Sequence, residues 1–120
     1  MKKLFGAIFL LSLLAPAEGR GGCSDAETSG FNCYRYALRG IRESTLPAVL
    51  KYAEKARQAA EKALDSAEEC MCYGAEGAFR SAYLASRDAV KATTVDESKR
   101  RLQNVLRAAE AGTEAAENCR

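Results

Sequence analysis

The chain has 120 residues, enough for one small domain, and carries 18 Lys and Arg against 16 Asp and Glu. It contains no His and no Trp, which excludes serine–histidine and cysteine–histidine catalysis and histidine-ligated metal sites. It also lacks a glycine-rich phosphate loop and a calcium loop with alternating Asp and Asn. We therefore expect a protein that is not an enzyme, with no catalytic residues, no cofactor and no metal site.

The first 17 residues have the pattern of a signal peptide. Lys2 and Lys3 precede an apolar run over residues 4–14, and Ala15-Pro16-Ala17 supplies the small residues of a cleavage site. The apolar run is too short for a bilayer, which needs about 20 residues. We expect export to the periplasm or the extracellular space, with no membrane span after signal removal. An uncleaved membrane anchor is the alternative.

Signal removal changes the charge of the chain. Without Lys2 and Lys3 the remaining 16 basic and 16 acidic side chains balance, so the net charge is zero. Nucleic-acid-binding proteins carry a basic footprint, and binding to anionic membrane surfaces also needs basic clusters. Neither partner is expected, and another protein remains the possible partner.

The helices are predicted in chain order from caps and periodicity. Residues 18–22 contain three glycines and are expected as a flexible lead-in. Ser24 with Glu27, and Thr94 with Glu97, have the spacing of capping boxes, and Pro47 suits a first helical turn. The predicted helices cover residues 25–43, 47–69, 75–92 and 95–118.

Small residues recur along these segments at spacings of three and four, and no segment alternates with a period of two. In the second helix this series is Val49, Ala53, Ala56, Ala60, Ala63, Ala67 and Cys70. The fold class is therefore all-α.

An internal repeat organises the chain around Cys70-Met71-Cys72. Residues 23–70 and 72–119 align without a gap at an offset of 49, with 11 identities in 48 positions. The identities include both cysteine pairs, Tyr34 with Tyr83, and Thr45 with Thr94. The likeness of any two Ala-rich helices is the competing explanation. It does not readily account for the shared cysteines, tyrosine and turn. Each copy reads as a helix, a turn and a helix, so residues 23–119 are predicted to form one four-helix bundle of two αα-hairpins.

The cysteines occupy the two ends of each predicted hairpin, which must lie side by side. An exported chain meets oxidising conditions, so we predict disulfides Cys23–Cys70 and Cys72–Cys119. Cys23–Cys119 and Cys33–Cys72 are rival pairings, and thiolate metal binding at Cys70-x-Cys72 is a further alternative. Cys33 is left as a free thiol, either a small buried residue or an exposed group that forms an intermolecular disulfide.

One candidate partner surface emerges from the comparison of the two copies. Phe31 and Leu38 of the first copy match Arg80 and Arg87 of the second, so a hairpin does not require them to be apolar. They could cover the joint between the hairpins, or they could be an exposed anchor for a partner. The predicted function is an exported, non-enzymatic binding protein, such as an envelope-associated module or an inhibitor. The alternative is a structural or stress-protective periplasmic protein with no defined ligand.

Overall fold

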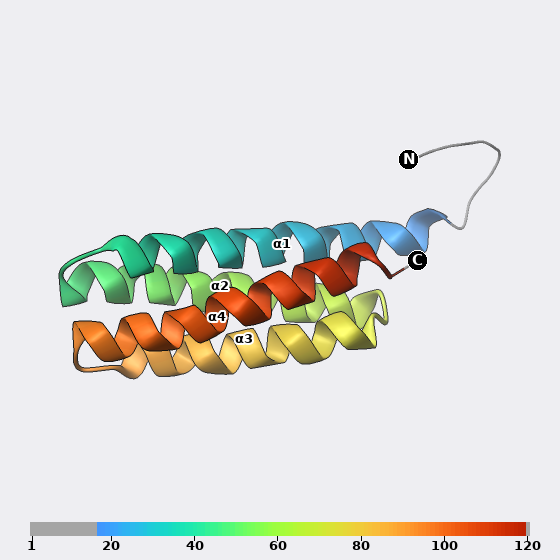
Figure 1. Ribbon diagram of the computed structural model, residues 1–120. Coiled ribbons are helices and arrows are strands. Elements are labelled where there is room, and N and C mark those ends of the chain that lie inside the picture. Colours follow the sequence, from blue (N-terminus) through green and yellow to red (C-terminus); the bar gives the residue numbers. More distant parts are fainter. Residues whose placement is uncertain (1–16, 120) are drawn as a thin grey trace.

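Four helices make up the described part of the chain, which in this computed structural model is residues 17–119, with side chains described from residue 23. The helices are α1 (Ala17–Arg42), α2 (Leu46–Glu69), α3 (Tyr73–Lys91) and α4 (Val95–Glu117). Each helix runs antiparallel to the next, and α4 returns to lie beside α1 (Figure 1). These residues contain no strand, so the predicted all-α four-helix bundle is confirmed.

Helix α1 begins at Ala17, and not at Asp25 as the sequence pattern predicted. Residues 18–22, expected as a flexible lead-in, have helical backbone within α1. The predicted N-cap at Ser24 is therefore wrong: its carbonyl lies inside the helix and accepts a hydrogen bond from Thr28 Oγ1 at 3.2 Å. Ser-x-x-Glu also fits the interior of a helix, so the pattern alone did not mark a start. The signal peptide stays a prediction, because residues 1–16 lie outside the described residues.

The turns within the two hairpins resemble each other but are capped differently. Thr45 and Thr94, which match in the repeat, are both extended N-cap residues. The Thr94 side chain accepts a hydrogen bond from the Glu97 backbone N–H at 3.2 Å, whereas Thr45 makes no such bond. Pro47 lies in the first turn of α2, where its missing N–H leaves no hydrogen bond broken.

A tight turn joins the hairpins between α2 and α3. The Met71 N–H donates to the Glu68 carbonyl at 3.1 Å, and the Cys72 N–H donates to the Ala67 carbonyl at 3.0 Å. This is the Schellman pattern, in which the residue after the C-cap takes a left-handed conformation. Met71 takes that conformation, with φ of 57°. The turn directs Cys70 and Cys72 toward different helices.

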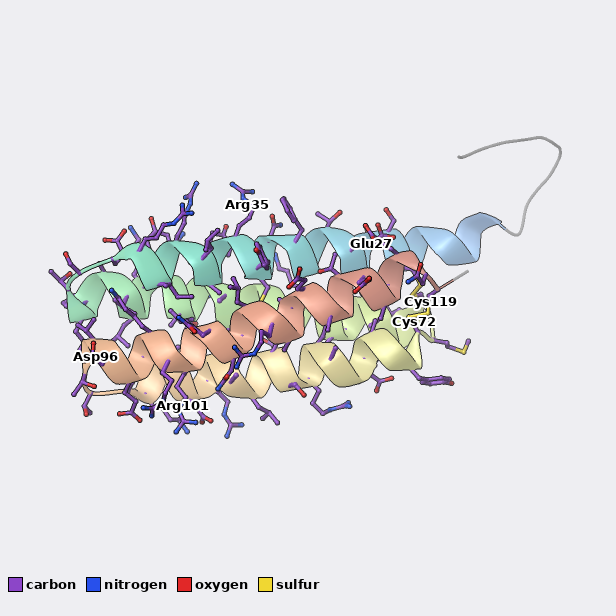
Figure 2. The ribbon with its side chains drawn as sticks, in the orientation of Figure 1. Glu27, Arg35, Cys72, Asp96, Arg101 and Cys119 are labelled. Atoms are coloured by element: carbon purple, nitrogen blue, oxygen red, sulfur yellow. A yellow bond between two sulfur atoms is a disulfide. The ribbon has the colours of Figure 1, made fainter. Side chains whose placement is uncertain are left out.

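Two disulfides close the hairpins at one end of the bundle. Cys23 pairs with Cys70 at a Cα–Cα distance of 5.4 Å, and Cys72 pairs with Cys119 at 5.9 Å. Figure 2 shows the Cys72–Cys119 pair at the end where α1 begins and α4 finishes. The predicted pairing is thus confirmed against its rivals, Cys23–Cys119 and Cys33–Cys72.

The core divides into two clusters along the bundle. The cluster nearer the hairpin turns contains the larger aliphatic side chains, Val49, Leu102 and Val105, together with Cys33 and several alanines. The cluster nearer the disulfides is made of the bridged cysteines Cys23 and Cys72, small alanines and one large side chain, Phe79. The disulfides therefore reinforce the end where aliphatic side chains bury least surface.

Phe79 fits because two glycines make room for it. A Cβ at Gly30 would lie 2.6 Å from the Phe79 ring, and one at Gly112 would lie 2.5 Å from it. Leu102 similarly lies over Gly40, where a Cβ would come within 2.6 Å. Phe79 is the repeat counterpart of Gly30, so the two copies pack as complementary shapes and not as identical ones.

Candidate functional site

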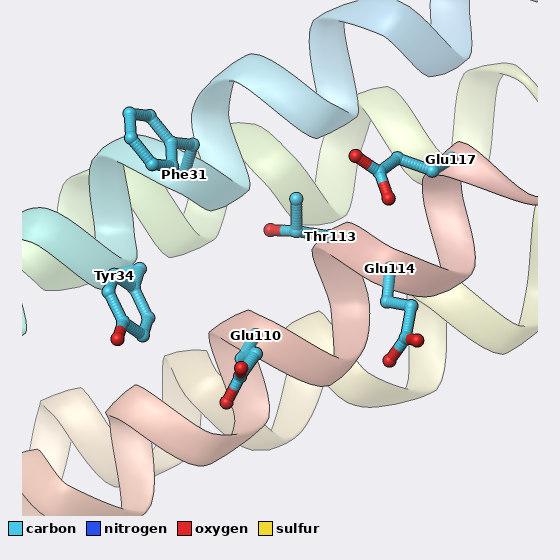
Figure 3. A pocket seen from close by; sticks show the side chains of 6 residues that line it. All are labelled: Phe31, Tyr34, Glu110, Thr113, Glu114 and Glu117. Atoms are coloured by element: carbon cyan, nitrogen blue, oxygen red, sulfur yellow. The ribbon is translucent and has the colours of Figure 1, made fainter.

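A groove runs between α1 and α4 on the outside of the bundle. It has a volume of about 350 Å³. Figure 3 shows Phe31 and Tyr34 on α1 and the remaining lining residues on α4, across the gap. The lining side chains are Phe31, Tyr34, Glu110, Thr113, Glu114 and Glu117. Aromatic rings on one wall and carboxylates on the other give the groove both an apolar and an anionic character.

The α1 wall presents Phe31 to solvent. Phe31 is 54% exposed, although most of the buried core is alanine and larger apolar side chains are scarce there. The Arg35 guanidinium lies 5.7 Å from the centre of the Phe31 ring, within the range of a cation–π contact. Tyr34 is half-buried and packs against the core, so it anchors this wall to the bundle.

The α4 wall contributes three exposed glutamates spaced along one side of the helix, Glu110, Glu114 and Glu117. Among the described side chains none of the three forms an ion pair. Thr113 lies between them, but its hydroxyl donates to the Ala109 carbonyl at 2.8 Å and is already satisfied. The carboxylates are thus the polar groups most available to a ligand.

The two residues singled out from the sequence take different positions. Phe31 lines the groove, which runs along the contact between the first hairpin and the second, and it is more than half exposed there. Leu38, two turns along α1 on the same face, is half-buried and is not part of the groove lining. The sequence did not predict that the glutamates of α4 lie across from Phe31. The pairing of α1 with α4 depends on how the hairpins dock, and repeat periodicity within each hairpin does not reveal it.

Cys33 is fully buried in the core and forms no disulfide. Burial raises the pKa of its thiol to about 12. The thiol therefore stays protonated at neutral pH, where it is neither a nucleophile nor a metal ligand. Its burial also rules out the exposed thiol considered from the sequence. No group of three or more Cys, Asp or Glu side chains converges as a metal-ligand set within the described residues.

Other large apolar side chains are exposed away from the groove. Met71 is 68% exposed and Tyr73 is 73% exposed, both at the joint between the hairpins. Leu84 on α3 is 45% exposed. None of these three side chains lines the α1/α4 groove or either of the two described pockets between α1 and α2. Phe31 differs from them because it is exposed and also lines a groove.

None of the four described helices has a stretch that is long and apolar enough to cross a bilayer. Comparison with family models, with curated proteins and with solved structures gives no match to this chain.

Proposed function

We propose that this protein is exported to the periplasm or the extracellular space and acts there as a non-enzymatic binding protein. The α1/α4 groove would hold a segment of a partner protein, with Phe31 as the apolar anchor. The two disulfides are compatible with export, because such bonds persist in oxidising compartments. A chain of this size that keeps its cysteines paired has the rigidity that a preformed binding surface needs.

The exposure of Phe31 is the observation that carries this proposal. An apolar ring that is more than half exposed contributes less to folding than a buried one, whereas exposed aromatic side chains are common anchors at interfaces. The second copy of the repeat has Arg80 at the same position, so a hairpin of this kind can form with a charged side chain there. The groove beside Phe31 gives a partner a concave surface to enter.

Site-specific photo-crosslinking in the native host tests the proposal. Benzoylphenylalanine is placed at position 31 of the full chain, and the same residue at position 84 serves as the control. Leu84 is also a partly exposed apolar residue, and it lies on α3, the helix that corresponds to α1 in the repeat. It does not line the groove. We expect a light-dependent adduct of discrete mass from position 31 and none from position 84.

Two results would count against the proposal. Equal, diffuse adducts from both positions would indicate random collisions and favour a passive structural protein. The absence of any adduct from position 31 would leave the groove without a partner. The same preparation tests export, because the cleaved chain recovered from the envelope or the medium should begin at Glu18.

A further inference from the structure

The internal repeat provides a second pair of neighbouring helices with which the groove can be compared. The offset of 49 relates α1 to α3 and α2 to α4, so the α1/α4 groove corresponds to the surface where α2 and α3 meet, called here the α2/α3 surface. Tyr34 corresponds to Tyr83, and the carboxylates are kept as well. The matched carboxylates are Glu27 with Glu76, Glu110 with Glu61, and Glu117 with Glu68.

On the α2/α3 surface, arginines of the chain itself balance these carboxylates. Arg80 lies 3.5 Å from Glu68 across the two helices and 3.2 Å from Glu76 on its own helix. Arg57 lies 3.7 Å from Glu61 and is also held by two hydrogen bonds to Glu54. Hydrogen bonding to Glu54, with a smaller contribution from Tyr83, raises the pKa of Arg57. The α2/α3 surface therefore already contains cations that pair with its carboxylates.

Where α1 and α4 meet, both arginines are replaced by apolar side chains. Phe31, in the groove, stands at the position of Arg80, and Leu106, outside the groove lining, stands at the position of Arg57. Leu106 is half-buried against the core, one turn along α4 from Glu110. The matching carboxylates, Glu110 and Glu117 in the groove lining and Glu27 on α1 outside it, form no ion pair with another described side chain. This surface keeps the anionic half of each pair and has apolar side chains in place of the cations.

We propose that a basic, amphipathic segment of a partner protein occupies this groove and supplies the missing arginines. This deepens the function proposed above and rests on it. The partner's apolar side chains would cover Phe31 and Leu106, and its arginines would pair with Glu110 and Glu117. Exposed ion pairs alone contribute little affinity, so the apolar contact is needed to exclude water from the charges. Arg35 against Phe31 shows that this ring accepts a guanidinium.

The probe for this inference is a synthetic amphipathic peptide with arginines flanking a stripe of leucines. Its affinity for the full mature chain, with both disulfides intact, is measured by calorimetry. A second peptide carries glutamate in place of each arginine. We expect the arginine peptide to bind at one site per chain and the glutamate peptide not to bind. Raising the salt from about 50 to 500 mM should weaken binding, because screening reduces attraction between exposed charges.

Matched variants locate the site. Phe31→Arg with Leu106→Arg gives the α1/α4 pair of helices the arginines of the α2/α3 surface, and we expect affinity to fall by at least about tenfold. Phe31→Arg alone tests the same point at an exposed side chain, where we expect the fold to be kept. Glu110→Gln with Glu117→Gln should also weaken binding. Glu61→Gln with Glu68→Gln, the matched change on the α2/α3 surface, should leave binding unchanged.

The outcomes separate this inference from the function on which it rests. If position 31 crosslinks a partner but the arginine peptide fails to bind, the groove is a binding site and the basic partner is wrong. Equal binding of the arginine peptide to wild type and to Phe31→Arg would overturn the inference as well. Equal losses of affinity from Glu110→Gln with Glu117→Gln and from Glu61→Gln with Glu68→Gln would overturn it too, because binding would then follow the total charge of the protein.

Discussion

The two copies of the repeat pack against each other through positions where one copy has a large side chain and the other has glycine. Phe79 fills a space that Gly30 and Gly112 leave open, and Leu102 fills one that Gly40 leaves open. The sequence showed the small residues as a periodic stripe, but it did not show that one large ring of the second copy would lie among them. Periodicity identifies which face of a helix is buried, whereas side-chain size matching depends on which helix lies opposite.

The Phe79 site gives a prediction at Gly112. Gly112→Ala adds a methyl group 2.5 Å from the ring of Phe79, which is fully buried. The steric cost of about 1–3 kcal/mol should exceed the gain in helix propensity of up to about 1 kcal/mol. We expect the free energy of unfolding to fall by about 1–2 kcal/mol, measured by denaturant titration.

Gly77 is the matched control for that measurement. It also lies in a helix, but a Cβ there would meet nothing within 4 Å. Gly77→Ala should therefore stabilise the protein by up to about 1 kcal/mol. Adding Phe79→Leu to Gly112→Ala should cost less than the same change in the wild type, since a smaller side chain relieves the clash. Additive effects of the two changes would contradict the packing argument.

At the scale of whole helices, the sequence predicted the number, order and turns of the elements. Helices α2, α3 and α4 begin within two residues of their predicted starts at Pro47, Ala75 and Val95. Pro47 and Thr94 carry the local signals of a helix start. The predicted start of α1 was wrong. The glycines in residues 18–22 suggested a flexible lead-in, but these residues have helical backbone.

The candidate site divides in the same way. Phe31 could be identified from the sequence, because its counterpart Arg80 shows that the position tolerates a charge. The opposite wall, with Glu110 and Glu117, could not be predicted, since it depends on the contact between α1 and α4. That contact joins the first helix to the last, and nothing within either hairpin specifies it.

The two matched turns give a prediction about capping. Thr94 accepts a hydrogen bond from the Glu97 N–H and Thr45 makes no cap bond, although both are exposed. Thr94→Ala should lower the free energy of unfolding by about 1 kcal/mol. Thr45→Ala should change it by less than about 0.5 kcal/mol. Thermal melts of both variants check this, and a larger loss at Thr45 than at Thr94 would be inconsistent with the assigned caps.

For the molecule as a whole, the interactions that stabilise the fold differ along a rod whose principal extents are 54 × 21 × 16 Å. The hairpin turns and the larger aliphatic side chains lie toward one end, and both disulfides lie at the other. The loop that each of these disulfides closes should stabilise the fold by up to roughly 4 kcal/mol, chiefly because the disulfide restricts the unfolded chain. The small alanine contacts at that end contribute less, because each buries little apolar surface.

Reduction of both disulfides should therefore loosen the bundle from one end. In hydrogen exchange on the reduced protein, we expect the largest loss of protection where the cluster near the disulfides lies, in residues 23–30, 63–79 and 112–119. The cluster that contains Val49, Leu102 and Val105 should keep more of its protection. The oxidised protein is the reference, and Cys33→Ala serves as a control for effects of the reductant on the free thiol. An equal loss of protection along all four helices would mean that the two clusters unfold as one unit. A larger loss near the hairpin turns would contradict the inference that the larger aliphatic side chains stabilise that end without the disulfides.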